Sequence, residues 1–301
     1  MKPRATLSPA LQPKPPWSLA FEAIGTTWQI KLYDDVPGEA GATLTAAIHR
    51  RIKAFDQVYS RFRTDSIVTA MATRAGTYTL PPDADALIKL YHELYVVTNG
   101  AMTPLIGQSL VEAGYDANYS LQPGQLHELP TWDETLSWQA PKLTLKQPAW
   151  LDFGAAGKGY LVDLVSEVIE SAGYHRYSVD AGGDIKIHTK NNLKVGLEHP
   201  DDPTQIIGVA SLSNASLCGS AGNRRAWASF HHIIDPRTLA SPRHLRAVWV
   251  SAASTILADA LTTALYMAPA SLLKPQFEFE FCLIYDDYHR ESSDGFPAKF
   301  F

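Results

Sequence analysis

The spacing of apolar residues predicts two long amphipathic helices in the first third of the chain. One stripe recurs at steps of three and four residues and comprises Leu44, Ile48, Ile52, Phe55, Tyr59 and Phe62. A second helix is predicted over residues 83–98, where Asn99-Gly100 provides a suitable C-terminal stop. Before both helices, alternating apolar residues predict two strands within residues 18–34, around Gly25-Thr26-Thr27.

Beyond residue 142 the pattern changes to short strands joined by glycine-containing turns. Two helices are expected here, one beginning near Ala156 and one running from Thr255 to Met267. Strands are expected within 177–187 on either side of Gly182-Gly183, and at 195–197, 206–212, 231–234, 248–251 and 279–285. Residues 114–140 look irregular. Because strands outnumber helices, an α+β fold with mixed or antiparallel sheets is favoured over a doubly wound parallel sheet.

Composition and charge exclude several classes of protein. With 46% hydrophobic and 19% charged residues, the chain is typical of a globular protein. Its 26 Lys and Arg against 31 Asp and Glu give a net charge of −5, without a dense basic run, so no nucleic-acid partner is expected. The two cysteines, Cys218 and Cys282, lack the spacing of a zinc site or a disulfide framework. No membrane span is expected either.

The N-terminal segment has a different character from the rest. Residues 1–17 are proline-rich and are predicted to form a flexible leader, whereas residues 18–301 are expected to form a single domain, because no linker divides them. Pro9, Pro13, Pro15 and Pro16 interrupt the apolar core that a signal peptide would need. We therefore expect a cytoplasmic location.

A glycine-rich loop and a later helix carry residues suited to phosphate and metal chemistry. Backbone N–H groups of residues 154–159, at the start of a helix and beside Lys158, suit an anion, although a purely structural turn fits as well. The loop is not a Walker A motif, because Lys158 is followed by glycine. Asp259 and Thr263 lie four residues apart and share one helix face. Their oxygen atoms are suitable ligands for Mg²⁺, although an ordinary pair of solvated polar side chains explains the spacing as well.

Two further segments are chemically ambiguous. The run from His231 to Thr238 begins as an apolar strand and ends in a proline turn, and its histidines are either proton carriers or structural hydrogen-bonding groups. Asp180-Ala181-Gly182-Gly183-Asp184 is either a tight turn or a backbone surface held against a ligand.

Six segments in this order resemble the motifs of the ApbE family, the flavin transferases that take FMN from FAD and attach it to a threonine or serine of a target protein. They are Gly25-Thr26-Thr27, Ser60-Arg61-Phe62 with Asp65-Ser66, Asp152 to Gly159, Gly182-Gly183-Asp184, His232 to Thr238, and Ala258-Asp259 with Thr263. The match runs from Ile24 to Met267. Each motif is weak alone, but six in sequence make coincidence improbable.

The resemblance implies a fold, a ligand and a set of site residues. The fold would be the α+β architecture of the family, with helices packed on mixed or antiparallel sheets and a flavin cleft between two lobes. Mg²⁺ would be held by Asp259, Thr263 and the main-chain oxygen of Ala155. The residues implied to bind FAD are Ile24, Phe62, Ala101, Met102, Thr103, Asp152, Lys158, Gly182, Gly183, Asp184 and Ile233. Catalysis would involve Asp259 and, as proton acceptor, His232 or a nearby carboxylate.

The chain departs from the family pattern at four places. Ile24 replaces a flavin-facing methionine, and Thr103 stands where relatives have an aspartate before the proline. A threonine-serine-glycine-aspartate motif is Ser220-Ala221-Gly222-Asn223, and Leu239 replaces a glycine. These changes leave the choice of target protein open.

Three functions follow from the resemblance. The first is Mg²⁺-dependent transfer of FMN from FAD to a Thr or Ser hydroxyl of an acceptor protein, with release of AMP. The second is an FAD diphosphatase, which uses water as the acceptor at the same site. The third is a flavin-binding protein without catalytic activity.

Overall fold

The computed structural model describes residues 16–222 and 225–301. Its helices are α1 (Gly38–Tyr59), α2 (Ile67–Met71), α3 (Ala84–Val97), η1 (Pro104–Ile106), α4 (Gly107–Glu112), α5 (Trp132–Thr135), α6 (Gly154–Ser171), α7 (Thr255–Ala264) and α8 (Ala270–Leu273). Its strands are β1 (Trp17–Ala23), β2 (Thr26–Leu32), β3 (Gly76–Thr79), β4 (Leu136–Gln139), β5 (Lys142–Leu145), β6 (Tyr177–Ala181), β7 (Ile185–His199), β8 (Asp202–Ala221), β9 (Ala226–Trp227), β10 (Phe230–His231), β11 (Leu245–Ala252), β12 (Glu280–Tyr285), β13 (Arg290–Ser292) and β14 (Ala298–Phe300).

A large antiparallel sheet organises the described chain. Its strand order is β1-β2-β6-β7-β8-β11-β12-β13, and β14 pairs with β8. A smaller sheet has the order β3-β5-β4, and β9 and β10 form a short ribbon. The strand pairs are antiparallel, as in β2 against β6 and β7 against β8. These sheets, together with the packed helices, confirm the α+β fold.

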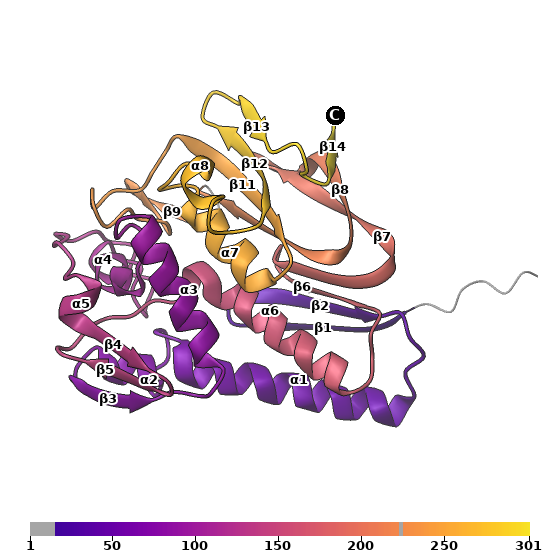
Figure 1. The fold of residues 1–301 in the computed structure, drawn as a ribbon, viewed down its shortest axis with the longest axis horizontal. Coiled ribbons are helices and arrows are strands. Elements are labelled where there is room, and N and C mark those ends of the chain that lie inside the picture. Colours follow the sequence, from indigo (N-terminus) through magenta and orange to yellow (C-terminus); the bar gives the residue numbers. More distant parts are fainter. Residues whose placement is uncertain (1–15, 223–224) are drawn as a thin grey trace, which may run out of the picture.

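Helices α1, α3, α6 and α7 pack together beside the large sheet (Figure 1). The apolar stripe of α1 is buried, because Leu44, Ile48, Ile52, Phe55 and Tyr59 are each at most 6% exposed. The main core joins these helices to the sheet. A second apolar cluster, which includes Leu212 and Trp249, involves β7, β8, β11 and β12.

Close contact between α6 and α7 requires a glycine. A Cβ placed on Gly159 would meet the main-chain oxygen of Thr255 and would lie 2.5 Å from Asp259 Cβ. Because real side chains do not tolerate such distances, only glycine permits the two helices to approach this closely. The approach brings the glycine-rich segment next to Asp259.

Several element boundaries differ from the sequence predictions. The prediction of a strand at 231–234 is wrong beyond His231, because β10 ends at His231 and the chain leaves the β9–β10 ribbon there. The helix expected to reach Met267 ends at Ala264, α1 ends before Phe62, and α6 begins at Gly154. The predicted irregular region ends in α5 and β4, and β13 and β14 were not predicted.

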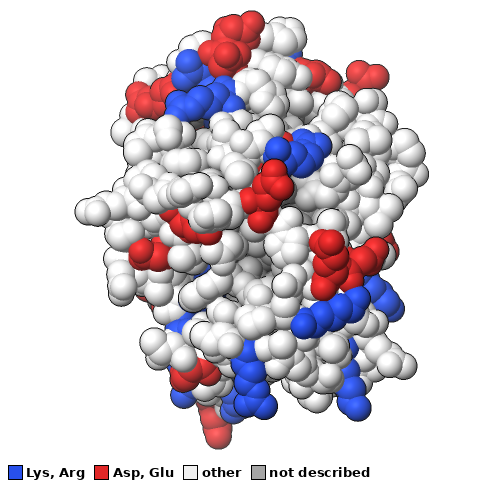
Figure 2. All heavy atoms as spheres, turned by 90° about the vertical axis from the view of Figure 1, so that its left-hand side faces the viewer, with Lys and Arg blue, Asp and Glu red and all other residues white. Residues whose placement is uncertain are grey.

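The predicted leader lies almost entirely outside the described residues. Trp17, which the sequence analysis assigned to the leader, is the first residue of β1. Within residues 16–222 and 225–301, no helix has the length and hydrophobicity needed to cross a lipid bilayer. Figure 2 shows one face of the molecule, which is hollowed near its centre and carries scattered charges of both signs.

Candidate active site

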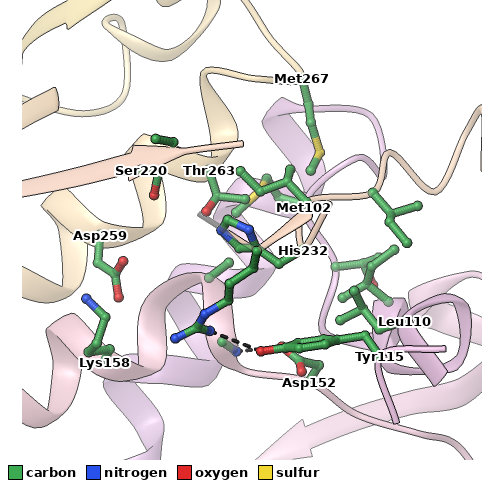
Figure 3. Close-up of a pocket in the computed structure, with 18 of the residues that line it drawn as sticks. Met102, Leu110, Tyr115, Asp152, Lys158, Ser220, His232, Asp259, Thr263 and Met267 are labelled. Carbon is green, nitrogen blue, oxygen red and sulfur yellow. Dashed lines mark hydrogen bonds between the residues drawn. The ribbon is translucent and has the colours of Figure 1, made fainter. Parts of the chain in front are cut away.

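Two adjoining cavities lie around the N-terminal turn of α6. The inner chamber, shown in Figure 3, has a volume of about 380 Å³ and is also lined by α7, the end of β8 and the loops at 101–106 and 225–234. The outer groove has a volume of about 820 Å³ and is lined by the end of α1 and the residues that follow it, and by residues 115–121. The two cavities share Phe62, Tyr115, Asp152, Gly154, Lys158 and Arg225.

The inner chamber brings together most of the residues that the sequence analysis selected. From that set it is lined by Phe62, Ala101, Met102, Thr103, Asp152, Ala155, Lys158, Gly182, His232, Ile233, Asp259 and Thr263. Ile24 lies in the outer groove, and Gly183 lines a slot of about 110 Å³ that shares Gly182 with the chamber. Asp184 is only 1% exposed and lines none of these three cavities.

Asp259, Thr263 and Ala155 supply oxygen donors to the inner chamber. Asp259 is 5% exposed, and its Oδ2 accepts the Gly159 N–H at 2.8 Å. Burial raises the pKa of the Asp259 carboxyl well above its usual range, and the nearby Asp184 adds to the rise. A buried carboxylate needs a positive partner. One carboxylate, one hydroxyl and one main-chain carbonyl are donors that Mg²⁺ accepts, so these residues fit the implied ion.

The protein alone does not complete a metal site. In the described part of the chain, no three His, Cys, Asp or Glu side chains are grouped so that they could hold a metal ion. Mg²⁺ usually keeps several waters and is completed by substrate phosphate oxygens. A site built around Asp259 would therefore depend on such a substrate.

Lys158 is held at the wall of the chamber by a buried carboxylate. Its Nζ forms an ion pair with Asp184 Oδ2, and its side chain faces Asp259 in Figure 3. Burial opposes the charge on Lys158, but the Asp184 and Asp259 carboxylates outweigh burial and raise its pKa. Lys158 therefore stays protonated at neutral pH, and Asp184 is positioned to act on a ligand through Lys158.

Asp152 shapes the start of α6 as well as lining the chamber. Its Oδ1 accepts the Gly154 N–H at 2.7 Å, and its Oδ2 is paired with Arg61 Nε at 2.5 Å. Arg61 is 3% exposed, so this pair is largely desolvated. Removing either partner would leave a buried charge without compensation. Its contact with FAD stays a prediction.

His232 presents a neutral imidazole to the chamber. Burial is the main cause that lowers the pKa of His232 to about 3, and Arg225 and His231 lower it further. Its Nδ1 is buried and has no hydrogen-bond partner among the described residues. A neutral imidazole nitrogen of this kind can accept a hydrogen bond from a hydroxyl group.

Two residues that line both cavities, Tyr115 and Arg225, were not predicted from the sequence. Tyr115 lies in a region that sequence patterns described only as irregular, and Arg225 sits in an arginine pair that resembles ordinary surface charge. Nothing local in the sequence indicates that these loops reach α6. Arg61 was part of a quoted motif, but its pairing with Asp152 was not predicted.

The departures from the family pattern fall in distinct places. Ser220 and Ala221 line the chamber, whereas Asn223 lies outside the described residues. Leu239 has a φ of 55°, and its N–H donates to the main-chain oxygen of Asp235 at 2.8 Å. Glycine adopts this left-handed conformation at lower cost than leucine. The turn is thus retained at some conformational cost.

The sequence model of the ApbE family matches residues 24–275. The chain is 26% identical to the FAD:protein FMN transferase of Haemophilus influenzae over 279 residues, which covers 83% of this chain and 80% of that protein. It is also 26% identical to the FAD:protein FMN transferase of Vibrio cholerae over 274 residues, covering 82% and 80% of the two chains.

Two solved structures share the fold. The flavin transferase ApbE from Vibrio cholerae has a TM-score of 0.77 at 20% identity, over 93% of this chain and 98% of that chain. The ApbE protein of Thermotoga maritima has a TM-score of 0.82 at 21% identity, over 93% and 97%. Together with the match over residues 24–275, this fold and the residues gathered in the inner chamber show that the chain belongs to the ApbE family.

Proposed function

We infer that this chain is a transferase that moves FMN from FAD to a Thr or Ser hydroxyl of a target protein, releases AMP and requires Mg²⁺. The observation that carries the proposal is the meeting of Asp259, Thr263 and Lys158 with the glycine-rich start of α6 in one chamber. Relatives named FAD:protein FMN transferases support the direction of transfer. A cytoplasmic location remains part of the proposal.

The proposed reaction is a phosphoryl-type substitution. The acceptor hydroxyl oxygen attacks the phosphorus on the FMN side of the diphosphate and forms a new P–O bond. The bond from this phosphorus to the bridging oxygen breaks, and AMP leaves with that oxygen. Negative charge grows on the leaving phosphate, so fixed positive groups that contact it accelerate the step.

Different residues of the inner chamber have different roles in this substitution. Lys158 offsets part of the charge of the diphosphate. The first N–H groups of α6 are engaged within the protein, since Gly154 donates to Asp152 and Gly157 to the main-chain oxygen of Phe153, so the helix adds only the positive end of its dipole. Mg²⁺ held by Asp259, Thr263 and the Ala155 carbonyl would neutralise further charge on the phosphate oxygens. Phe62 and Tyr115 line both cavities and offer aromatic contact for a ring of FAD.

His232 is the proposed acceptor of the hydroxyl proton. A pKa of about 3 makes it a weak base in the free protein. A bound diphosphate brings negative charge beside the imidazole, which raises the pKa of a histidine. We therefore propose that substrate binding itself makes His232 a competent base.

Peptides that differ by one hydroxyl test the function. The protein is incubated with FAD, Mg²⁺ and a panel of threonine peptides, and in parallel with peptides in which valine replaces the threonine. The proposal expects a phosphate-linked flavin adduct on threonine peptides alone, with one AMP per adduct by mass spectrometry. Free FMN and AMP with unmodified peptides would instead identify a diphosphatase. Tight FAD binding without AMP release would identify a flavin-binding protein.

A further inference from the structure

We propose that Arg225 binds the diphosphate of FAD and is a second cationic contact for it besides Lys158. The inference rests on the proposed function, because it takes FAD as the ligand. It concerns a residue that none of the quoted motifs contains.

Among the described residues, four Lys and Arg side chains line the inner chamber and outer groove: Arg61, Arg63, Lys158 and Arg225. Arg61 is paired with Asp152, and Lys158 is paired with Asp184. Arg63 is paired with both Asp56 and Asp65.

Arg225 differs from the other three cations. In the described ranges, no carboxylate lies within ion-pair distance of the Arg225 guanidinium. Its Nη1 donates a hydrogen bond to Tyr115 Oη at 3.1 Å. Arg225 is an exposed residue, so the guanidinium N–H donors that Tyr115 does not use face solvent and are available to a ligand in the cavities. It is therefore a natural contact for an anion.

Asp259 is the negative counterpart of Arg225. It lines the inner chamber and forms no ion pair within 4.0 Å among the described residues, although Lys158 is near. The cavity thus holds one carboxylate without a direct cationic partner and one guanidinium without an anionic partner. A diphosphate with a divalent cation supplies both missing charges.

Tyr115 holds the guanidinium of Arg225 at the junction of the two cavities. Its main-chain oxygen accepts a hydrogen bond from Arg61 Nη1 at 2.7 Å, which ties it to the Arg61–Asp152 pair. Its ring stacks on Trp227 with centroids 5.5 Å apart and an interplanar angle of 22°. In Figure 3 the Tyr115 hydroxyl points into the chamber from the side of Asp152. Tyr115 is therefore a positioning residue for Arg225.

Arginine and lysine contribute differently to this kind of contact. A guanidinium binds two phosphate oxygens in a fork, whereas an ammonium acts as a point charge. Charge-assisted hydrogen bonds contribute about 1.5–3 kcal/mol each, which corresponds to roughly tenfold to hundredfold in affinity. The loss of Arg225 should therefore be selective for ligands that carry phosphate.

Dissociation constants for FAD and riboflavin test the inference, because riboflavin has the same ring system without phosphate. They are measured by equilibrium dialysis on the whole chain, with Mg²⁺, for the native protein, R225M, R225K and the control R246M. Arg246 is paired with Asp201 and lines neither cavity. Thermal midpoints are recorded to show that each variant is folded.

We expect R225M to weaken FAD binding at least tenfold and to change riboflavin binding less than twofold. R225K should recover part of the loss, and R246M should behave like the native protein. Equal weakening of FAD and riboflavin, or unchanged FAD binding in R225M, would overturn the role of Arg225. If the native protein binds FAD but transfers no FMN, the proposed function fails while the role of Arg225 is still tested.

Discussion

The floor of the inner chamber and the wall of the outer groove are built in contrasting ways. The floor consists of α6 and α7, where Gly159 lets the helices meet and Asp259 is 5% exposed. The wall includes loop residues such as Tyr119, which is 53% exposed and has a φ of 52°. The floor is thus made of packed helices, whereas this part of the wall is an exposed, irregular loop.

This contrast separates two tasks of a group-transfer site. Charged groups need fixed positions, because electrostatic stabilisation depends on preorganised geometry, and packed helices provide it. Recognition of a flat ring or of a protein segment tolerates variation, which loops provide. Changes in the floor should therefore affect turnover or folding, and changes in the wall should affect affinity.

The largest expected effect is on turnover in D259A and D259N. Both variants remove the negative charge available to Mg²⁺. Loss of residues that only support a metal ligand lowers activity by up to about 100-fold, so loss of the ligand itself should lower the rate of AMP release by at least about that factor. Burial raises the pKa of Asp259, which means that its ionised form costs stability in the folded state at neutral pH. The thermal midpoint of D259N without Mg²⁺ should therefore equal or exceed that of the native protein, because its amide oxygen still accepts the Gly159 N–H, whereas D259A leaves this N–H without an acceptor. Full activity in D259N would contradict the metal assignment.

A methyl group between the helices should destabilise the floor. G159A places a Cβ against the main chain of Thr255, so we expect a loss of about 1–3 kcal/mol in the free energy of unfolding, measured by urea denaturation. G157A is the matched control, because its Cβ would lie 3.6 Å from Phe55 Cζ, an ordinary contact. Helix propensity predicts that G157A is neutral or stabilising by up to about 1 kcal/mol. Equal stability of the two variants would refute the close approach of α6 and α7.

His232 lines the inner chamber and should make folding depend on pH. Its pKa is lowered to about 3, while an unfolded histidine titrates near 6.5. As pH falls from 6.5 towards 3, the histidine is protonated in the unfolded state but stays neutral in the folded state, so the free energy of unfolding decreases. Between pH 7 and pH 5, the free energy of unfolding should decrease less in H232Q than in the native protein, and the difference between the two decreases should be up to about 2 kcal/mol. Parallel urea denaturation curves at these two pH values measure the difference, and identical pH dependence would argue against a buried neutral imidazole.

The smallest expected effect belongs to the wall. The ring of Tyr119 stacks on Phe62 with centroids 5.3 Å apart and an interplanar angle of 8°. Stacked aromatic pairs contribute about 0.5–1.5 kcal/mol, so Y119A should raise the KM for FAD about two- to tenfold and leave kcat nearly unchanged. Y288A is the control, because Tyr288 is 54% exposed with a φ of 66° but lines neither cavity. If kcat falls in Y119A, the division of tasks between floor and wall is wrong.

Local sequence patterns were sufficient to predict the main helices and the helix face that Asp259 and Thr263 share. Apolar periodicity placed α1 and α3 because burial of one helix face depends only on residue spacing. The four-residue interval between Asp259 and Thr263 predicts that both project from the same face of the helix, and both line the inner chamber. Glycines near Lys158 marked the start of α6 because such clusters permit close backbone approach.

The partner of each charged residue was decided only by the tertiary structure. Asp184 was predicted to contact FAD, but it is buried against Lys158, and Asp152 is engaged by Arg61, which lies 91 residues away. Arg225 has no carboxylate beside it among the described residues, which no local pattern could show. Ion pairing depends on distances between distant segments, and the identity of a charged residue does not specify its partner. The sequence thus determined which chemistry is present, and the packing of α6 against α7 and the loops decided which charges remain available to a ligand.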